Sequence, residues 1–314
     1  MDLDRVEEKP GPFCMSFGFD LTPLISSIEA VGLIHLPLVV RNRAGLFDPV
    51  TGYLRLKALK ALHWDKVPCM DLSHTGLSPV DLLFLNLQDN LSVRRLNNVE
   101  KGMVVARFRG YMSEEKIREN YAGFLQLSRE WDLEVLLKIE GLPERVKTAI
   151  ADGSISMNSM GRLVGVDERS FLAALKRMTD LRLNFNQQLK FIDYIIDISI
   201  REKRPVYRIL DEESFLDLRD DKRINTPQKA KKMLGLLKKR RYPFIFSAEI
   251  SFQEMVGGLH LPPGVRIRHP PSFESPEYRL EVDFKDGMEL IKKIKLMTQD
   301  KDITKIKDPW DPRR

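Results

Sequence analysis

Three short runs in this chain of 314 residues combine polar side chains with glycine or proline at spacings that suit phosphate chemistry. We name them boxes: the first runs from Gly32 to Pro37, the second from Gly52 to Ala58, and the third contains Asp89-Asn90 and continues to Glu100. Each box alone is a weak signal. Their order predicts a small phosphate-handling α/β module followed by a helical segment that could hold DNA.

The second box could bind a phosphate at the start of a helix. Gly52 lies between a predicted strand and the helical pattern of Leu54, Ala58 and Leu62. A glycine there lets backbone N–H groups approach an anion, and Arg55 on the first turn would neutralise its charge. The alternative reading, a turn before an ordinary surface helix, stays open.

The third box offers oxygen ligands for a metal ion. Asp89 and Asn90 directly follow a helix expected at 79–87. Mg²⁺ prefers a carboxylate or amide oxygen together with waters and substrate phosphates. Arg94 and Arg95 add positive charge beside this pair, which makes them candidate DNA contacts. The alternative is a helix cap followed by a turn.

Alternating helices and strands should hold the boxes in place. Apolar residues at helical spacing end at Gly32, and short β-branched runs bounded by turn residues follow. The expected elements are a helix at 21–31, a strand at 36–40, a helix at 54–62, a strand at 66–71 and a helix at 79–87. This order predicts an α/β fold for the N-terminal part.

The boxes resemble those of the ParB/RepB partition family, which carries G-x-x-x-P, then G-E-R-R-x-x-A, then E-N-x-Q-R leading into L-N-x-x-E. The matching residues are Gly32 and Pro37, then Gly52, Arg55 and Ala58, then Asp89, Asn90, Leu96, Asn97 and Glu100. Tyr53 and Leu54 stand where the family has Glu-Arg, and Val93 replaces the arginine that closes the third box, so the nucleotide boxes are divergent. The resemblance covers about the first half of the chain.

This resemblance implies a fold, cofactors and partners. The family's N-terminal domain has the ParB/sulfiredoxin fold, and the implied cofactors are CTP and Mg²⁺. The implied nucleotide-binding residues are Gly32, Pro37, Gly52, Arg55, Asp89 and Asn90, with Asp89 and Asn90 as metal ligands. Asp89 replaces the family's glutamate, which leaves weak CTP hydrolysis an open question. A ParA-type ATPase usually binds the family through a basic N-terminal peptide, whereas this chain begins Met1-Asp-Leu-Asp.

The middle of the chain suggests a helix-turn-helix. Ser113 is a suitable N-cap for a helix whose apolar stripe includes Phe124, and a second helix is expected from Leu127. In this motif the N-terminal residues of the second helix meet base edges. Those residues are Arg129, Glu130, Asp132 and Glu134. Because three carboxylates facing DNA would be repelled by phosphates, we expect Arg129 to contact DNA with little sequence-specific reading.

A basic amphipathic helix is expected between residues 226 and 243, where no acidic residue occurs. Such a helix can neutralise several phosphates without regard to sequence. Its candidate DNA-binding residues are Lys231, Lys238, Lys239, Arg240 and Arg241. The alternative is a solvated run of charge. Downstream, a helix, strands at 265–268 and 278–284, and a helix at 288–297 predict a small α+β module.

Composition limits the cellular compartment and the classes of partner that we expect for the protein. The net charge of +6 is a small excess, so only the distribution of charge can implicate nucleic acid. Two distant cysteines argue against a disulfide framework or a zinc site and favour a reducing cytoplasm. The most apolar stretch, at 191–200, is too short to span a bilayer, so no membrane partner is expected.

The fold class we predict is multidomain α+β. The domains are a ParB/sulfiredoxin-like α/β domain at 1–112, an all-α helix-turn-helix domain at 113–204 and a small α+β domain at 205–314. The predicted function is a ParB-like, nucleoid-associated dimer that binds double-stranded DNA as a CTP-gated clamp in chromosome or plasmid partition or its regulation. The alternatives are a nucleotide-dependent enzyme of the same fold, a small-molecule kinase or a nuclease, and a catalytically silent scaffold.

Overall fold

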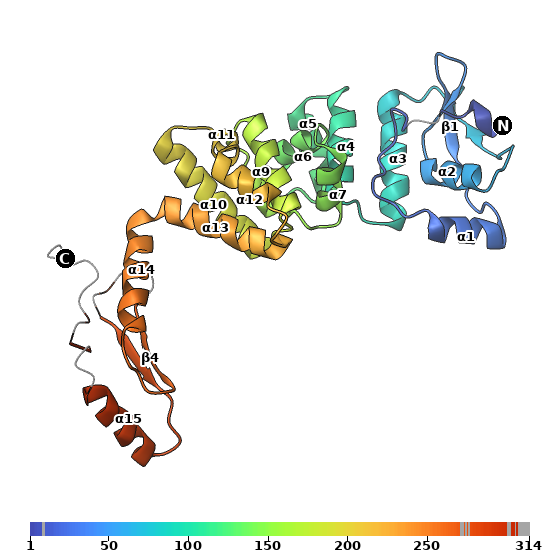
Figure 1. Cartoon of the computed structure of the whole chain (residues 1–314). Coiled ribbons are helices and arrows are strands. Elements are labelled where there is room, and N and C mark those ends of the chain that lie inside the picture. The colour runs from blue at the N-terminus through green and yellow to red at the C-terminus, as the bar shows by residue number, and fades with distance from the viewer. Residues whose placement is uncertain are drawn as a thin grey trace. The chain divides into compact units, whose positions relative to one another are not determined.

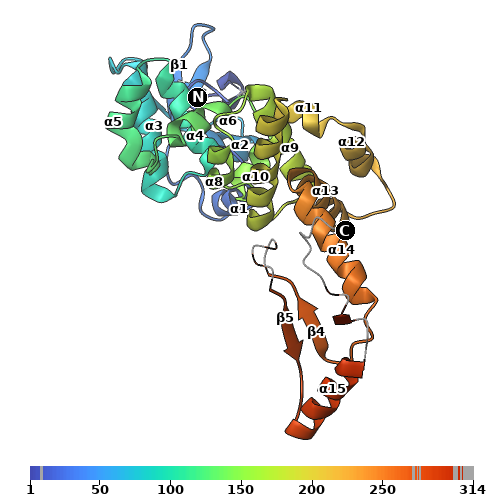
Figure 2. The same ribbon diagram turned by 90° about the vertical axis from the view of Figure 1, so that its left-hand side faces the viewer.

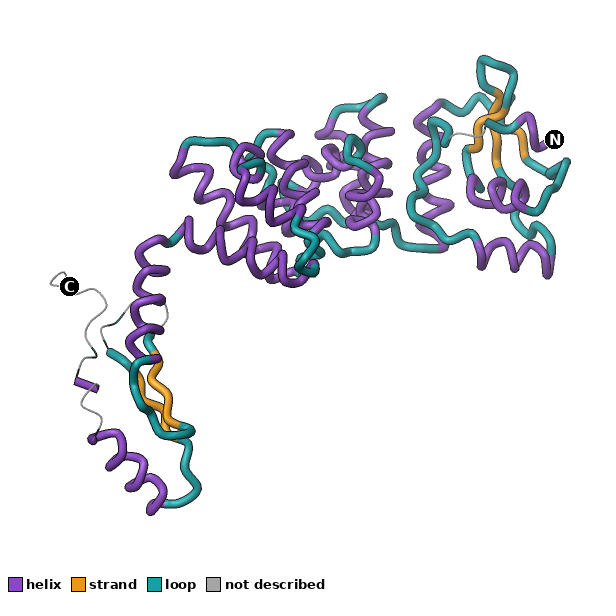
Figure 3. Tube along the Cα trace, viewed as in Figure 1, coloured by secondary structure: helices purple, strands orange, loops and turns teal. Residues whose placement is uncertain are grey.

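The computed structural model describes residues 1–7, 10–270, 273, 275, 277–299, 303–304 and 306. The chain forms two compact units, Met1–Asp193 with Lys203–Ala230, and Tyr194–Glu202 with Lys231–Arg314. Most of the described residues are helical, and the strands lie near the two ends of the chain (Figures 1 and 3). The predicted domain boundaries at 112 and 204 stay predictions.

The N-terminal part is the predicted mixture of helices and strands. Its elements are η1 (Leu3–Arg5), α1 (Thr22–Val31), β1 (Leu38–Arg41), β2 (Phe47–Pro49), α2 (Tyr53–Ala61), β3 (Met70–Asp71) and α3 (Pro79–Val93). Strand β1 is central, with β2 antiparallel on one side and β3 parallel on the other. The expected strand at 66–71 is therefore shortened to its last two residues.

Turn chemistry and apolar burial explain this sheet. The Asn42 side-chain oxygen accepts the N–H groups of Ala44 and Leu46, which turns the chain between β1 and β2. Helices α1 and α2 pack together through one apolar cluster. Its buried members are Leu3, Val6, Ile28, Leu56, Ala58, Leu59 and Val67. The Leu38 carbonyl oxygen of β1 accepts the N–H groups of Val50 (2.8 Å) and Thr51 (3.1 Å), which fixes where α2 and the second box begin.

Helix α3 is longer than predicted. A capping box begins it: the Ser78 hydroxyl accepts the N–H of Asp81 (3.3 Å), and the Asp81 carboxylate accepts the N–H of Ser78 (2.9 Å). The helix continues to Val93, so Asp89 and Asn90 lie inside it rather than after it, and the expected end at residue 87 is wrong. No glycine or proline stops the helix there.

Helices alone follow α3 up to residue 257 of the described chain. They are α4 (Asn98–Arg109), α5 (Glu114–Leu125), α6 (Asp132–Ile139), α7 (Glu144–Ala151), α8 (Met157–Arg162), α9 (Glu168–Asp180), α10 (Phe185–Glu202), α11 (Val206–Leu210), α12 (Glu213–Asp220), α13 (Thr226–Arg241) and α14 (Pro243–Gly257). Helix α4 can lie close to α6 because it presents Gly102, where a Cβ would be 2.9 Å from the Leu136 carbonyl oxygen.

The predicted helix-turn-helix pair corresponds to α5 and α6, with two differences. Helix α6 begins at Asp132 rather than Leu127, since Gln126 adopts a left-handed conformation (φ +56°) that ends α5. The Phe124 ring stays exposed and meets the exposed Phe84 ring of α3, with centroids 6.1 Å apart. None of the described helices is both long and apolar enough to cross a bilayer.

The C-terminal unit ends in the predicted α+β arrangement. Strands β4 (Val265–Arg268) and β5 (Arg279–Val282) pair antiparallel and lie side by side, with α15 (Gly287–Gln299) following β5 (Figure 2). Helix α14 covers them through Phe252, whose ring stacks on Tyr278 with centroids 5.4 Å apart. Strand β5 is shorter than the expected 278–284.

Candidate nucleotide and nucleic-acid sites

The first two boxes meet at Gly52. This residue precedes α2 with φ +79°, and a Cβ there would lie 3.1 Å from Cβ of the buried Pro37. Both the backbone angle and the contact therefore require glycine. Since Gly52 has no side chain to cap α2, the first N–H groups of the helix are left for another acceptor. Gly32 lies apart from this contact, at the C-cap of α1.

Arg55 joins the first box to the third. Its Nη1 donates to the His35 carbonyl oxygen (2.8 Å), and its Nη2 contacts the Asp89 carboxylate (3.2 Å). The Asp89 side chain is 46% exposed, so this ion pair lies at the surface and is weak. We call the surface formed by Pro37, Gly52, Arg55 and Asp89 the cradle. The structure thus brings together the stretches near residues 52 and 89 that the sequence separates.

Two charged side chains of the third box, Arg94 and Glu100, pair with each other below the surface. Glu100 is fully buried and accepts from Arg94 Nη1 (2.7 Å) and from the backbone N–H of Asn97 (3.0 Å). Arg94 also donates to the Asn90 side-chain oxygen (2.7 Å). Arg94 therefore compensates a buried carboxylate in this conformation, whereas Arg95 is exposed. The DNA contacts predicted for Arg94 and Arg95 stay predictions. Of the two, the exposed Arg95 is the more accessible to DNA.

The cradle offers one carboxylate, that of Asp89, to a metal ion in exchange for its ion pair with Arg55. Asp89 presents oxygens at the surface, which suits Mg²⁺ because that ion takes most of its ligands from water and phosphates. The Asn90 amide instead donates to the Asn86 carbonyl oxygen (2.9 Å) while its oxygen accepts from Arg94. Asn90 could coordinate metal only after leaving Arg94. Among the described residues, no three or more His, Cys, Asp or Glu side chains gather as metal ligands.

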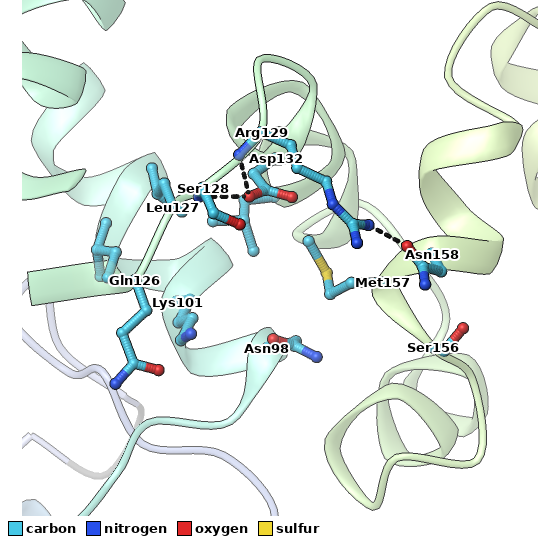
Figure 4. A pocket seen from close by; sticks show the side chains of 12 residues that line it. Asn98, Lys101, Gln126, Leu127, Ser128, Arg129, Asp132, Ser156, Met157 and Asn158 are labelled. Atoms are coloured by element: carbon cyan, nitrogen blue, oxygen red, sulfur yellow. Dashed lines mark hydrogen bonds between the residues drawn. The ribbon is translucent and has the colours of Figure 1, made fainter. Parts of the chain in front are cut away.

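A polar cavity of about 310 Å³ lies beside the start of α6 (Figure 4). Lys101 and Asn98 reach it from α4, and Arg129 reaches it from the loop before α6. The Arg129 guanidinium stacks over Trp131, 5.0 Å from the ring centroid, and donates to the Asn158 side chain. We call this surface the α6 cavity. Neither Lys101 nor Arg129 forms an ion pair with any residue that the structure describes.

One of the three carboxylates near this cavity is turned inward. Asp132 is buried and accepts the backbone N–H groups of Ser128 (2.8 Å) and Arg129 (2.9 Å). Glu134 pairs with Lys138 one helical turn later (3.3 Å). Glu130 and Glu134 stay exposed, so the expected repulsion of DNA by carboxylates applies to these two residues and stays a prediction. Burial lowers the pKa of Lys101, and the nearby charge of Asp132 partly offsets that shift.

Sequence reasoning missed three residues of the α6 cavity: Asn98, Lys101 and Asn158. The first two are three residues apart on α4, so a helical projection would have placed them on one face. Asn158 belongs to α8, and no local pattern indicates that this helix packs beside the loop before α6.

The basic end of α13 is largely neutralised. Lys238 pairs with Glu249 of α14 (2.8 Å), and Arg240 pairs with Glu202 of α10 (2.6 Å). Arg241 pairs with Asp197 of α10. Lys231 is exposed, and the Lys239 ammonium lies over the Phe246 ring. The five DNA contacts predicted on α13 stay predictions, and the structure leaves only Lys231 and Lys239 of them outside ion pairs with described residues.

Comparisons with known proteins place the chain among partition proteins. No protein-family model matches it. It is 27% identical over 201 residues to the probable chromosome-partitioning protein ParB of Campylobacter jejuni, covering 62% of this chain and 68% of that protein. It is 26% identical over 242 residues to stage 0 sporulation protein J of Bacillus subtilis, covering 74% of this chain and 83% of that protein.

Solved structures of one further protein also align. They are crystal structures of C-terminally truncated ParB from Caulobacter crescentus, complexed to the centromeric parS site and with CTP-γ-S. The first covers 60% of this chain and 94% of that chain at 18% identity and TM-score 0.34. The second covers 56% and 96% at 20% identity and TM-score 0.26. By its sequence relatives and its three boxes, the chain is similar to proteins of the ParB-type partition family.

Proposed function

We propose that this chain is a DNA-binding partition protein of ParB type whose cradle binds CTP together with Mg²⁺. The observation that carries the proposal is the position of Arg55, which contacts the first box at His35 and the third box at Asp89. The partition function of the relatives supports it. The same proposal includes two further properties. The N-terminal part has the ParB/sulfiredoxin fold, and a ParA-type ATPase is a partner of the chain.

The side chains of the cradle have separable roles. The turn at Gly52 leaves backbone N–H groups for phosphate oxygens, and Arg55 supplies positive charge. Asp89 would hold Mg²⁺, which neutralises phosphate charge when bound. Arg55 and Asp89 now pair with each other, so both would exchange that surface ion pair for the nucleotide and its metal. Because the pair is weak, this exchange costs little.

Equilibrium binding of labelled CTP to the full chain tests the nucleotide site. We expect saturable, Mg²⁺-dependent binding that weakens at least about tenfold in Arg55→Gln, since one charge-assisted contact contributes about 1.5–3 kcal/mol. Asp89→Asn should remove the Mg²⁺ dependence. Arg43→Gln, an exposed arginine in the turn between β1 and β2, is the matched control and should bind like the parent. Absence of saturable binding at millimolar CTP would refute the nucleotide role.

DNA binding is proposed at the α6 cavity. Arg129 and Lys101 are the cations there that lack an ion pair with any described residue. Arg129 precedes α6, the second helix of the predicted helix-turn-helix, whose N-terminal end meets DNA in that motif, and Lys101 lines the same cavity from α4. Arg129 is held in place by Trp131 and Asn158, so less side-chain freedom is lost on binding. These contacts are to the phosphate backbone in our proposal, which predicts salt-sensitive affinity.

Self-association is proposed through the C-terminal unit. Strand β5, helix α15 and the loop between them expose several large apolar side chains. They are Leu280, Phe284, Met288, Ile291, Ile294 and Leu296. Burying this face against a second copy would remove apolar surface from water. Ile291→Glu should convert a dimer into monomers in sedimentation equilibrium, while Val31→Glu, an exposed position on α1, should not. A dimer that persists in Ile291→Glu contradicts this interface.

A further inference from the structure

A second polar cavity, of about 290 Å³, lies between α9, α11 and α12 in the first unit. Four basic side chains line it, together with two carboxylates and one phenol ring. They are Arg169, Lys176, Arg177, Arg219, Asp180, Asp211 and Tyr207. None of them belongs to the three boxes, to the α6 cavity or to α13. We call it the α9 cavity.

Arg177 is the buried cation of this cavity. Only 6% of it is exposed, and its guanidinium donates to the carbonyl oxygens of Leu210 (3.0 Å) and Phe215 (3.4 Å). It forms no ion pair with any residue in the described part of the chain. Burial, and then the charge of Arg219, lower its pKa, but a guanidinium stays protonated in proteins. The cavity therefore contains a desolvated positive charge that an anion would stabilise.

Two further cations of the α9 cavity are available to a ligand. Arg169 stacks on the Tyr207 ring at 4.0 Å, which fixes the guanidinium while leaving its N–H edges free. Lys176 is exposed, one position before Arg177 on α9. Neither forms an ion pair with a described residue. Stacking and helical position therefore hold three unpaired cations around one space.

The other charges of the α9 cavity are mostly satisfied locally. Asp180 pairs with Arg145 (2.9 Å), and Arg219 pairs with Asp220 (2.7 Å). Asp211 is the lining carboxylate without an ion pair to a described residue. Three unpaired cations against one unpaired carboxylate leave the cavity net positive, which favours an anion over a cation or a neutral ligand.

We propose that the α9 cavity binds a phosphate group, separate from the cradle. The planar guanidinium of arginine matches phosphate oxygens two at a time, and two unpaired guanidinium groups and an ammonium line this cavity. The phosphate could come from a small free ligand or from the backbone of DNA, and the chemistry of recognition is the same. The site does not depend on the proposed CTP cradle.

Calorimetric titration of the full chain with inorganic phosphate, at ionic strength held constant with chloride, tests this site. We expect saturable binding in the parent and a loss of at least about tenfold in affinity in the double variant Arg169→Gln/Lys176→Gln. Both residues are largely outside the core, whereas Arg177 holds two backbone carbonyls and is left unchanged. Equal heats with phosphate and chloride, or unchanged affinity in the double variant, would overturn the proposal.

Two control variants make the result specific. Arg208→Gln removes another cation beside Tyr207, 5.4 Å from the ring centroid, that does not line the cavity, and it should bind phosphate like the parent. Arg55→Gln alters only the cradle and should keep the phosphate binding that the double variant loses, which separates this site from the cradle. If phosphate binding is lost in Arg55→Gln but kept in the double variant, the ion binds at the cradle and the proposal fails.

Short duplex DNA then identifies the source of the phosphate. If the ligand is a free phosphate, the double variant should bind a duplex as the parent does. If the ligand is a backbone phosphate, the double variant should lose duplex affinity and inorganic phosphate should compete with the duplex for the parent. Either result upholds the phosphate site once the calorimetric titration has detected it.

Discussion

The α6 cavity and the end of α13 both contain predicted DNA-binding residues, yet their cations differ in what surrounds them. At the α6 cavity, the buried Asp132 turns its carboxylate to backbone N–H groups, which leaves Arg129 without an ion pair to a described residue. At the end of α13, Glu202 pairs with Arg240 although the two are 38 residues apart in sequence. Charge on a local stretch therefore does not define the charge of a surface.

Backbone carbonyl groups at the end of α13 also bind α10. Arg201 of α10 donates to the carbonyl oxygens of Arg240 (2.6 Å) and Arg241 (3.0 Å). The last carbonyls of a helix have no partner within it, so an arginine from a second helix satisfies them. This contact and the ion pairs hold α10 to α13. We infer that the basic residues at this end mainly stabilise the C-terminal unit.

The largest expected effect is on DNA affinity. The double variant Lys101→Gln/Arg129→Gln should bind duplex DNA about 100-fold more weakly, because each lost phosphate contact costs about tenfold. The slope of log affinity against log salt should fall by about two. Fluorescence anisotropy with a labelled duplex over a salt series measures both.

A double variant at α13 that leaves the net charge unchanged provides the control for that measurement. Arg240→Gln/Glu202→Gln removes an ion pair without changing net charge. It should bind DNA within about threefold of the parent, because neither group contacts DNA in our proposal. If this control loses as much affinity as the α6 double variant, the contrast between the two regions is wrong.

A smaller effect is expected on the packing that positions Lys101. Gly102→Ala would place a Cβ 2.9 Å from the Leu136 carbonyl oxygen, so α4 and α6 must move apart. Overpacking of this kind destabilises by about 1–3 kcal/mol. Urea unfolding of the parent and variant measures the change. Gly235→Ala, where no heavy atom lies within 4 Å of the added Cβ, should stabilise its helix slightly and is the control.

A third change should remove the ion-pair partner of Arg240 on α13. Glu202→Gln removes the carboxylate that neutralises Arg240, so the region becomes more positive without a new basic residue. We expect non-specific duplex affinity to rise about threefold at low salt and to return to the parental value at high salt. Unchanged affinity at low salt would mean that Arg240 cannot reach DNA even when unpaired.

Local patterns predicted most of the fold but only part of the sites. Helical spacing and Gly32 located α1, and the order of the boxes anticipated that Arg55 and Asp89 meet. Helices α11 and α12 are too short for periodicity to reveal. Asn158 and Glu202 took on their roles through tertiary packing between segments far apart in sequence. Such contacts leave no signal in a single local window.

The smallest expected effect is a pH dependence that arises from Lys101. Burial lowers the pKa of this lysine, so it loses its proton at a lower pH than an exposed lysine does. Phosphate contacts need the ammonium form, so raising the pH from neutral toward the ordinary lysine pKa of about 10.4 should weaken DNA binding by the parent.

The effect of Lys101 on folding has the opposite sign. Its folded-state pKa is below the unfolded value, so the unfolded chain binds the proton more tightly and stability rises as pH increases through the two values. Lys101→Arg stays charged and should show neither trend. At each pH, the duplex affinity and the unfolding free energy of the parent are therefore compared with those of this variant. Over the same pH series, fluorescence anisotropy measures duplex affinity and urea unfolding measures stability. If duplex affinity falls equally in parent and variant, another group causes the pH dependence and the α6 cavity loses Lys101 as a contact.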